Sequence, residues 1–125
     1  MVKSIISGAC ALIILLAAAF YEGTYVKNTF DTFHVYLQQT NEKLELKTAC
    51  AEDARALQRF WLEKKRALHV FIPHNEIKEI DLWLAECSAF TAAGNFEEAQ
   101  SKITVLICLC EQIPKTFLLK AENIF

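Results

Sequence analysis

A run of eighteen uncharged residues directly follows Lys3 and constrains this 125-residue chain more than any other feature. The run covers residues 4–21 and reads SIISGACALIILLAAAFY. A helix needs roughly 17–25 mostly apolar residues to cross the core of a bilayer. Positively charged flanks tend to stay in the cytoplasm, and Lys3 precedes the run. We therefore predict a transmembrane signal anchor over residues 1–22 and an extracytoplasmic helical bundle domain over residues 23–125, in the cell membrane as a single-pass protein.

The apolar run has three other readings. It is a cleavable signal peptide if the small residues at 17–19 form a cleavage site. It is a lipoprotein signal if it ends at Cys10, although most of the apolar core then follows the cysteine that should end it. It is a core helix if the protein is soluble. Tyr21 and Tyr25 stand where aromatic residues favour the membrane interface and support a retained anchor, but cleavage stays open.

The charge balance excludes some classes of partner. The chain has 13 basic and 15 acidic residues, a net charge of −2, and the two signs are mixed along it. Nucleic-acid binding and a polybasic membrane-surface patch both need clustered Lys and Arg. The one basic cluster, at residues 64–66, is short and reads as a solvated helix face. We expect no nucleic-acid partner.

The cysteines do not form an obvious disulfide framework. Cys10 lies inside the apolar run, and Cys50, Cys87, Cys108 and Cys110 follow. Cys87 and Cys110 fall at apolar helical positions, where a free cysteine behaves as a small hydrophobic residue. We expect mostly free, buried thiols, while four cysteines in an exported domain leave disulfide pairing open.

The exported part is predicted to be all-α. No Gly or Pro occurs between Gly23 and Pro73, and residues typical of helices dominate that stretch. Apolar residues recur there at steps of three and four. The phase of the stripe changes between Leu44 and Cys50, so residues 24–72 form either one bent helix or two helices. The two stripes consist of Val26, Phe30, Phe33, Leu37 and Leu44, and of Cys50, Ala54, Leu57, Trp61, Leu68 and Phe71.

Two further helices are predicted after Pro73. A proline ends the preceding helix and suits the first turn of the next one. One stripe contains Ile77, Ile80, Leu84, Cys87 and Ala93, with Trp83 and Phe90 at its border; the other contains Phe96, Ala99, Ile103, Leu106, Cys110 and Ile113. Pro114 should end or kink the last helix, and the apolar tail at 117–125 should dock on the bundle. The predicted architecture is an anchor followed by an antiparallel bundle of three or four amphipathic helices.

The segment around Gly94 resembles one tetratricopeptide hairpin. Gly94 permits a tight turn before Phe96, and Ala99 allows close approach of two helices, with Trp83 eleven residues before the glycine. The pattern has no second copy, whereas a solenoid needs about three repeats. We therefore predict a single hairpin of this shape.

Candidate catalytic or metal-binding motifs are incomplete. His74 and Glu76 echo the His-x-Glu of zinc deaminases, but the Pro-Cys-x-x-Cys half is missing. Cys108 and Cys110 point to opposite sides of a helix, so they cannot chelate one ion. We expect no metal, no cofactor, no catalytic residue and no enzymatic activity. His74 is predicted to bridge the corner at Pro73 to the preceding helix by a hydrogen bond, and Glu76 suits the positive end of the new helix.

The order of these features resembles a family of short membrane proteins from clostridia and related bacteria, described as domain of unknown function 4363. The likeness lies in the anchor, in Trp61 followed by Lys64 or Lys65, and in three segments: FIPHNEI at 71–77, NFEEA at 95–99 and ENIF at 122–125. The resemblance implies no activity and transfers no catalytic residue. It suggests a multi-spanning membrane protein as partner and a role for Trp61, His74 and Glu76.

These observations favour a membrane-tethered helical interaction module or accessory protein that partners another membrane protein. The alternative is an extracytoplasmic sensor, or a domain that binds a small ligand or a wall component. An exposed apolar groove would support the first. A closed pocket lined by Trp61, Trp83 and His74 would support the second. Clustered carboxylates and histidines with shifted pKa values would indicate an enzyme. The candidate interaction or structural residues are Trp61, His74, Glu76, Trp83, Gly94 and Phe96.

Overall fold

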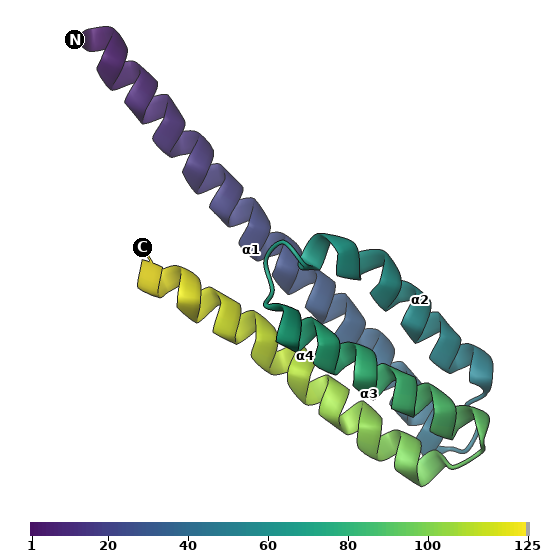
Figure 1. The fold of residues 1–125 in the computed structure, drawn as a ribbon. Helices are drawn as coiled ribbons and strands as arrows, with labels where there is room; N and C mark the ends of the chain where they lie inside the picture. Colours follow the sequence, from purple (N-terminus) through teal and green to yellow (C-terminus); the bar gives the residue numbers. More distant parts are fainter. Residues whose placement is uncertain (125) are drawn as a thin grey trace.

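The protein is an antiparallel four-helix bundle with one helix that extends far beyond it (Figure 1). The computed structural model describes the backbone of residues 1–124 and the side chains of residues 1–117. The helices are α1 (Val2–Glu45), α2 (Ala51–Leu68), α3 (His74–Ala92) and α4 (Phe96–Ile124). No strand occurs within the described backbone. The all-α prediction is confirmed.

Helix α1 contains both the apolar run and the first helix of the bundle. Its side chains are exposed from the N-terminus to residue 18, and the first fully buried one is Val26. The helix passes Gly23 without interruption. The proposed boundary between residues 1–22 and 23–125 is therefore a change in burial along one helix rather than a break in the chain.

Each helix packs against two neighbours in a closed ring. Helix α1 lies between α2 and α4, and α3 lies between the same two helices on the opposite side. Figure 1 shows that the α2–α3 connection lies at the end of the bundle from which the apolar segment emerges. The α1–α2 and α3–α4 connections lie at the far end.

The break between α1 and α2 confirms the two-helix reading of residues 24–72. Helix α1 ends with the amide of Thr48 donating to the carbonyl of Lys43 at 2.8 Å, and with Lys47 in the left-handed region at φ 59°. This arrangement is a Schellman motif, which satisfies carbonyls at a helix end. Cys50 was predicted to be buried, but it is the exposed N-cap of α2, and its amide donates to Asp53 at 2.9 Å.

The α3–α4 turn uses the same motif with a glycine. Gly94 has φ 77°, and the amide of Asn95 donates to the carbonyl of Phe90 at 2.9 Å. The predicted stop at Gly94 is confirmed. Thr91 completes the buried stripe of α3 in place of the predicted Ala93, which is exposed because it lies in the turn.

We expect Gly94→Ala to lower the free energy of unfolding by about 1–2 kcal/mol, because a Cβ is strained in the left-handed region. A Cβ at Gly94 meets no atom within 4 Å, so the cost comes from the backbone conformation alone. Lys47→Gly is the matched control: it relieves the same strain at the other turn and should raise stability. Urea titrations of the two variants in mild detergent measure both changes. Equal stability of Gly94→Ala and the parent protein would contradict this account.

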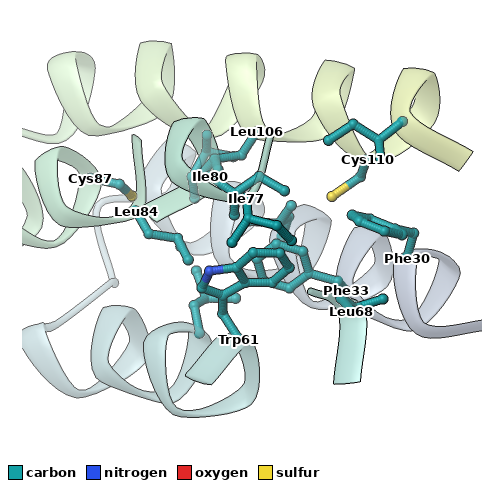
Figure 2. Packing of buried hydrophobic residues seen from close by; sticks show 14 of the residues in the cluster. Phe30, Phe33, Trp61, Leu68, Ile77, Ile80, Leu84, Cys87, Leu106 and Cys110 are labelled. Carbon is teal, nitrogen blue, oxygen red and sulfur yellow. The ribbon is translucent and has the colours of Figure 1, made fainter. Parts of the chain in front are cut away.

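The core is formed by the predicted stripes of all four helices. Residues from the four stripes meet around Trp61, as Figure 2 shows. Phe30 and Phe33 enter from α1, and Leu106 and Cys110 enter from α4. The periodicity of three and four residues thus identified nearly all of the buried side chains.

Pro114 does not end the last helix. Helix α4 continues through it to Ile124. A proline inside a helix removes one backbone hydrogen bond, but Pro114 itself is buried, and Ile113 and Phe117 pack on the core beside it. Packing on both sides of the proline keeps the helix intact. The predicted docking of residues 118–125 concerns side chains outside the described ones.

Candidate functional site

Trp61 connects the core to a polar contact between α2 and α3. Its side chain is 2% exposed, which confirms the predicted burial. The indole Nε1 donates to Asp81 Oδ1 at 2.6 Å, and Lys65 Nζ donates to Asp81 Oδ2 at 2.7 Å. A buried indole N–H needs an acceptor, and Asp81 provides it at the edge of the core. The basic cluster at 64–66 is therefore not uniformly solvated.

An aromatic stack runs from Trp61 to the surface between α1 and α2. Phe33 stacks on Trp61 and on Phe60, with ring centroids 5.6 Å apart in both pairs. Tyr36 meets the edge of Phe60 at 5.1 Å. Phe60 is partly buried and Tyr36 is exposed. The stack ends at the rim of an open groove.

The groove lies between α1 and α2, and α1 packs less closely on α2 than on α4. It consists of two hollows that share Tyr36, with volumes of about 470 Å³ near the apolar segment and about 600 Å³ toward the far end. The first hollow is lined by Tyr21, Thr24, Tyr25, Asn28, Thr29, Thr32, Tyr36, Phe60 and Lys64. The second is lined by Tyr36, Gln39, Thr40, Glu42, Lys43, Leu46, Asp53, Ala56 and Leu57. We call these residues together the α1–α2 groove.

An ion pair closes the far end of the groove. Lys43 Nζ donates to Asp53 Oδ1 at 2.8 Å. The hydrogen bond from Lys43, together with the amide of Cys50, lowers the pKa of Asp53, and Asp53 raises the pKa of Lys43. Since the pKa of Asp53 is depressed by folding, its contribution to stability is present at neutral pH and is lost as the pH falls through the lowered value.

The structure does not bring Trp61, Trp83 and His74 into one pocket. Trp83 is half-buried on α3, where Lys102 Nζ lies 5.2 Å from its ring centroid as a cation–π pair. Trp61 borders a shallow hollow of about 300 Å³ with Asp81, but neither Trp83 nor His74 lines it. Gly94 lies in the α3–α4 turn at the far end, and the partly buried Phe96 is the first residue of α4.

His74 and Glu76 lie at the predicted corner, but the contacts of His74 differ from the predicted ones. The ring of His74 stacks on that of His69, with centroids 5.5 Å apart. Its side chain is exposed, and the hydrogen bond that we expected to the preceding helix is not formed with any described residue. Glu76 lies in the first turn of α3, next to the positive end of the helix dipole.

The cysteines divide into two classes. Cys87 and Cys110 are free and buried, as predicted, and Cys10, Cys50 and Cys108 are free and exposed. Burial raises the pKa of Cys87 to about 11, and it raises that of Cys110 as well. Such thiols are unreactive because the thiolate is the nucleophile.

We expect Cys87 and Cys110 to resist thiol alkylation in the folded protein. In mild detergent near neutral pH, a maleimide should label Cys50 and Cys108 and leave the two buried thiols unmodified. Unfolding in urea should expose Cys87 and Cys110 to the reagent. Peptide mass spectrometry of the labelled protein checks this, and rapid labelling of Cys87 without denaturant would show that α3 opens readily.

Sequence reasoning missed three residues that define the site. Asp81, Tyr36 and Phe60 lie beside the buried stripes of their helices rather than on them. Tyr36 and Phe60 carried a weak signal, since large aromatics next to an apolar stripe often mark its edge. Asp81 carried none, because its pairing with Trp61 spans twenty residues. Within the described residues, no group of three His, Cys, Asp or Glu side chains is arranged to hold a metal ion.

Comparison with known proteins places the chain in a family. Residues 20–124 match the family described as Domain of unknown function (DUF4363). The chain belongs to this family. The match begins in the last turn of the apolar run and covers the four-helix bundle, and it confirms the resemblance drawn from the sequence motifs. No curated protein and no solved structure matches the chain.

Proposed function

We propose that this protein is a membrane-tethered interaction module that binds a helix of another membrane protein along the α1–α2 groove. The observation that carries the proposal is the continuity of α1. One helix of 44 residues starts in an exposed apolar segment and goes on to line the groove. The groove is thereby held at a constant position relative to the membrane.

The apolar segment has the length of a membrane span. At about 1.5 Å per residue, residues 4–21 extend about 27 Å, close to the ~30 Å of a bilayer core. Helix α1 is long and apolar enough to cross a membrane, and none of the most apolar window is buried in the bundle. Lys3 at one end and Glu22 at the other favour an extracytoplasmic bundle in the cell membrane.

The face of α1 that lines the groove continues into the anchor. Groove residues Tyr21, Thr24, Asn28, Thr32 and Tyr36 follow steps of three and four residues, which keep them on one face. The same spacing backward from Tyr21 reaches Ala18, Ile14, Cys10 and Ser7. Three of these four are small, and small residues let membrane helices approach closely. A partner helix can therefore follow α1 from the membrane into the groove.

Topology is the first prediction of this proposal. We expect a reporter that is active only in the cytoplasm to be silent when fused after Phe125, and one that is active only outside to work there. The reason is the positive charge of Lys3 before the apolar run. Reversing the bias, with Lys3→Glu and Glu22→Lys, is the control and should raise cytoplasmic activity. Strong cytoplasmic activity of the unmodified fusion would overturn the orientation.

Binding in the groove is tested by photo-crosslinking in intact cells. A photoreactive residue at Thr32 or Tyr36 should yield one and the same crosslinked membrane protein. The same residue at Leu82, which is 60% exposed on α3, should not yield it. Thr32→Trp fills the first hollow and should abolish the crosslink from Tyr36. Crosslinks of equal yield from Leu82 would place the interface elsewhere.

Recognition of a small ligand is a second candidate, and the far hollow favours it. Its volume of about 600 Å³ is within the range of about 300–1,000 Å³ for small-molecule sites. Its lining combines Tyr36 and Leu57 with the ion pair of Lys43 and Asp53. Ala56→Trp would occupy this hollow and leave the first one open. Loss of the crosslink from Thr32 in that variant would favour a partner that spans both hollows.

A further inference from the structure

We infer that the α2–α3 corner, residues 69–74, rests in the phospholipid headgroup layer of the membrane that α1 spans. This inference deepens the proposed function and depends on its membrane anchor. The bundle then has two attachments to the membrane, the anchor and the corner, and cannot swing freely about α1.

The height of the corner above the bilayer core follows from its contacts. The ring of Phe71 lies 6.5 Å from that of Tyr25 on α1 and 6.5 Å from that of Phe117 on α4. Tyr25 follows Tyr21, the last residue of the apolar run, by four residues, or about 6 Å along the helix. The headgroup layer is about 5–8 Å thick on each side of the core. The corner is therefore level with that layer.

The side chains at this level suit a membrane interface. Tyr21 and Tyr25 stack with centroids 6.4 Å apart, and Phe71 and Phe117 extend the group across three elements. Aromatic side chains concentrate at both interfaces of membrane proteins. Figure 1 shows that the α2–α3 connection and the C-terminal end of α4 lie on the side where the apolar segment leaves the bundle.

Val70 is the apolar side chain that the corner leaves exposed. It is 77% exposed, although its neighbour Ile72 is buried. The amides of Phe71 and Ile72 donate to the carbonyl of Leu68 at 3.0 and 2.8 Å, so the corner is a tight turn on a buried residue. Val70 cannot turn into the core without breaking these bonds. Contact with lipid would cover it.

The charges at the two ends of the bundle are consistent with this orientation. The exposed bases Arg66 and Lys115 and the histidines His69 and His74 flank the corner. Glu22 and Glu76 are the nearby acids. The far end carries the exposed acids Glu42, Glu45, Glu97 and Glu98, together with the exposed Lys47 and with Lys43, which pairs with Asp53. A lipid surface that carries anionic headgroups attracts juxtamembrane basic residues.

Depth-dependent fluorescence quenching of the full-length protein in liposomes tests the inference. One probe tryptophan at a time is introduced in a Trp83→Phe background, in which the buried Trp61 remains as a second tryptophan and gives a constant signal from the core. The probes are Val70→Trp at the corner, Leu46→Trp at the far end and Leu12→Trp in the anchor. Leu46 is 74% exposed, which matches Val70. The lipids carry bromine either just below the glycerol backbone or near the bilayer centre.

We expect shallow bromines to lower the emission of Val70→Trp, because the corner lies in the headgroup layer, and to leave Leu46→Trp unchanged. Deep bromines should quench Leu12→Trp most. If Leu12→Trp is quenched and Val70→Trp and Leu46→Trp are quenched equally weakly, the anchor inserts into the bilayer but the corner does not contact it. That result would overturn this inference alone. Absence of quenching at both Leu12→Trp and Val70→Trp would overturn the membrane anchor and the inference together.

Discussion

Trp61→Ala is expected to lower the free energy of unfolding by about 3–5 kcal/mol, the range for removal of a large buried aromatic side chain. Trp61 is 2% exposed and packs on Phe33 and Phe30, with centroids 5.6 and 6.3 Å apart. The substitution leaves a cavity where residues from all four helices meet. It also removes the donor to Asp81. Urea denaturation of the full chain in mild detergent, followed by circular dichroism, measures the loss.

Trp61→Phe removes the hydrogen bond and keeps part of the packing. It leaves a six-membered aromatic ring in the core and removes the N–H donor to Asp81 with the rest of the five-membered ring, so a loss of about 1–3 kcal/mol is expected. Asp81 remains paired with Lys65 in this variant. A loss below about 1 kcal/mol for Trp61→Ala would contradict the central position of this residue in the core.

Phe33→Ala should have an effect of similar size, about 3–5 kcal/mol. Phe33 is 1% exposed and lies between the rings of Trp61 and Phe60, so it joins α1 to α2. These two helices pack less closely on each other than α1 packs on α4. Its loss should also widen the α1–α2 groove. The same denaturation experiment measures the change.

Two comparisons make the Phe33 prediction specific. Val35→Ala, at a neighbouring position that is 48% exposed, should change stability by no more than about 0.5 kcal/mol. The double variant of Phe33 and Trp61 should show a coupling energy of about 0.5–3 kcal/mol, because stacked residues are not independent. Additive losses would show that the two rings contribute separately.

The sequence predicted features that depend on residues close together in the chain better than contacts between residues far apart in it. Helix existence, the stop at Gly94 and the buried stripes follow from local rules, and the sequence predicted them. Lys47 shows where a local rule fails, since a lysine has no intrinsic preference for the left-handed region that it occupies at the end of α1. At Pro114, predicted to end or kink the last helix, α4 does not end, and Ile113 and Phe117 pack on the core beside the proline.

The candidate site was less predictable than the fold. The pattern of three and four residues identified Trp61 as buried, because burial depends on which face of its own helix a residue occupies. It could not identify Asp81 as its partner or Tyr36 and Phe60 as the rim of the groove, because these contacts join residues on different helices. For the same reason, the sequence could not decide whether Trp61, Trp83 and His74 form the pocket that would support the alternative function, and the hollow at Trp61 includes neither Trp83 nor His74.

The sequence by itself determined that the chain is helical, where most of its helices begin and end, which faces they bury, and that one apolar segment has the length of a membrane span. These properties depend on periodicity and on residues adjacent in the chain. The tertiary structure decided that the apolar segment and the first bundle helix are one continuous helix, that α1 and α2 leave a groove, and that the α2–α3 corner is level with Tyr25. Those results depend on how tightly separate helices pack, and packing depends on side-chain shapes brought together from distant parts of the chain.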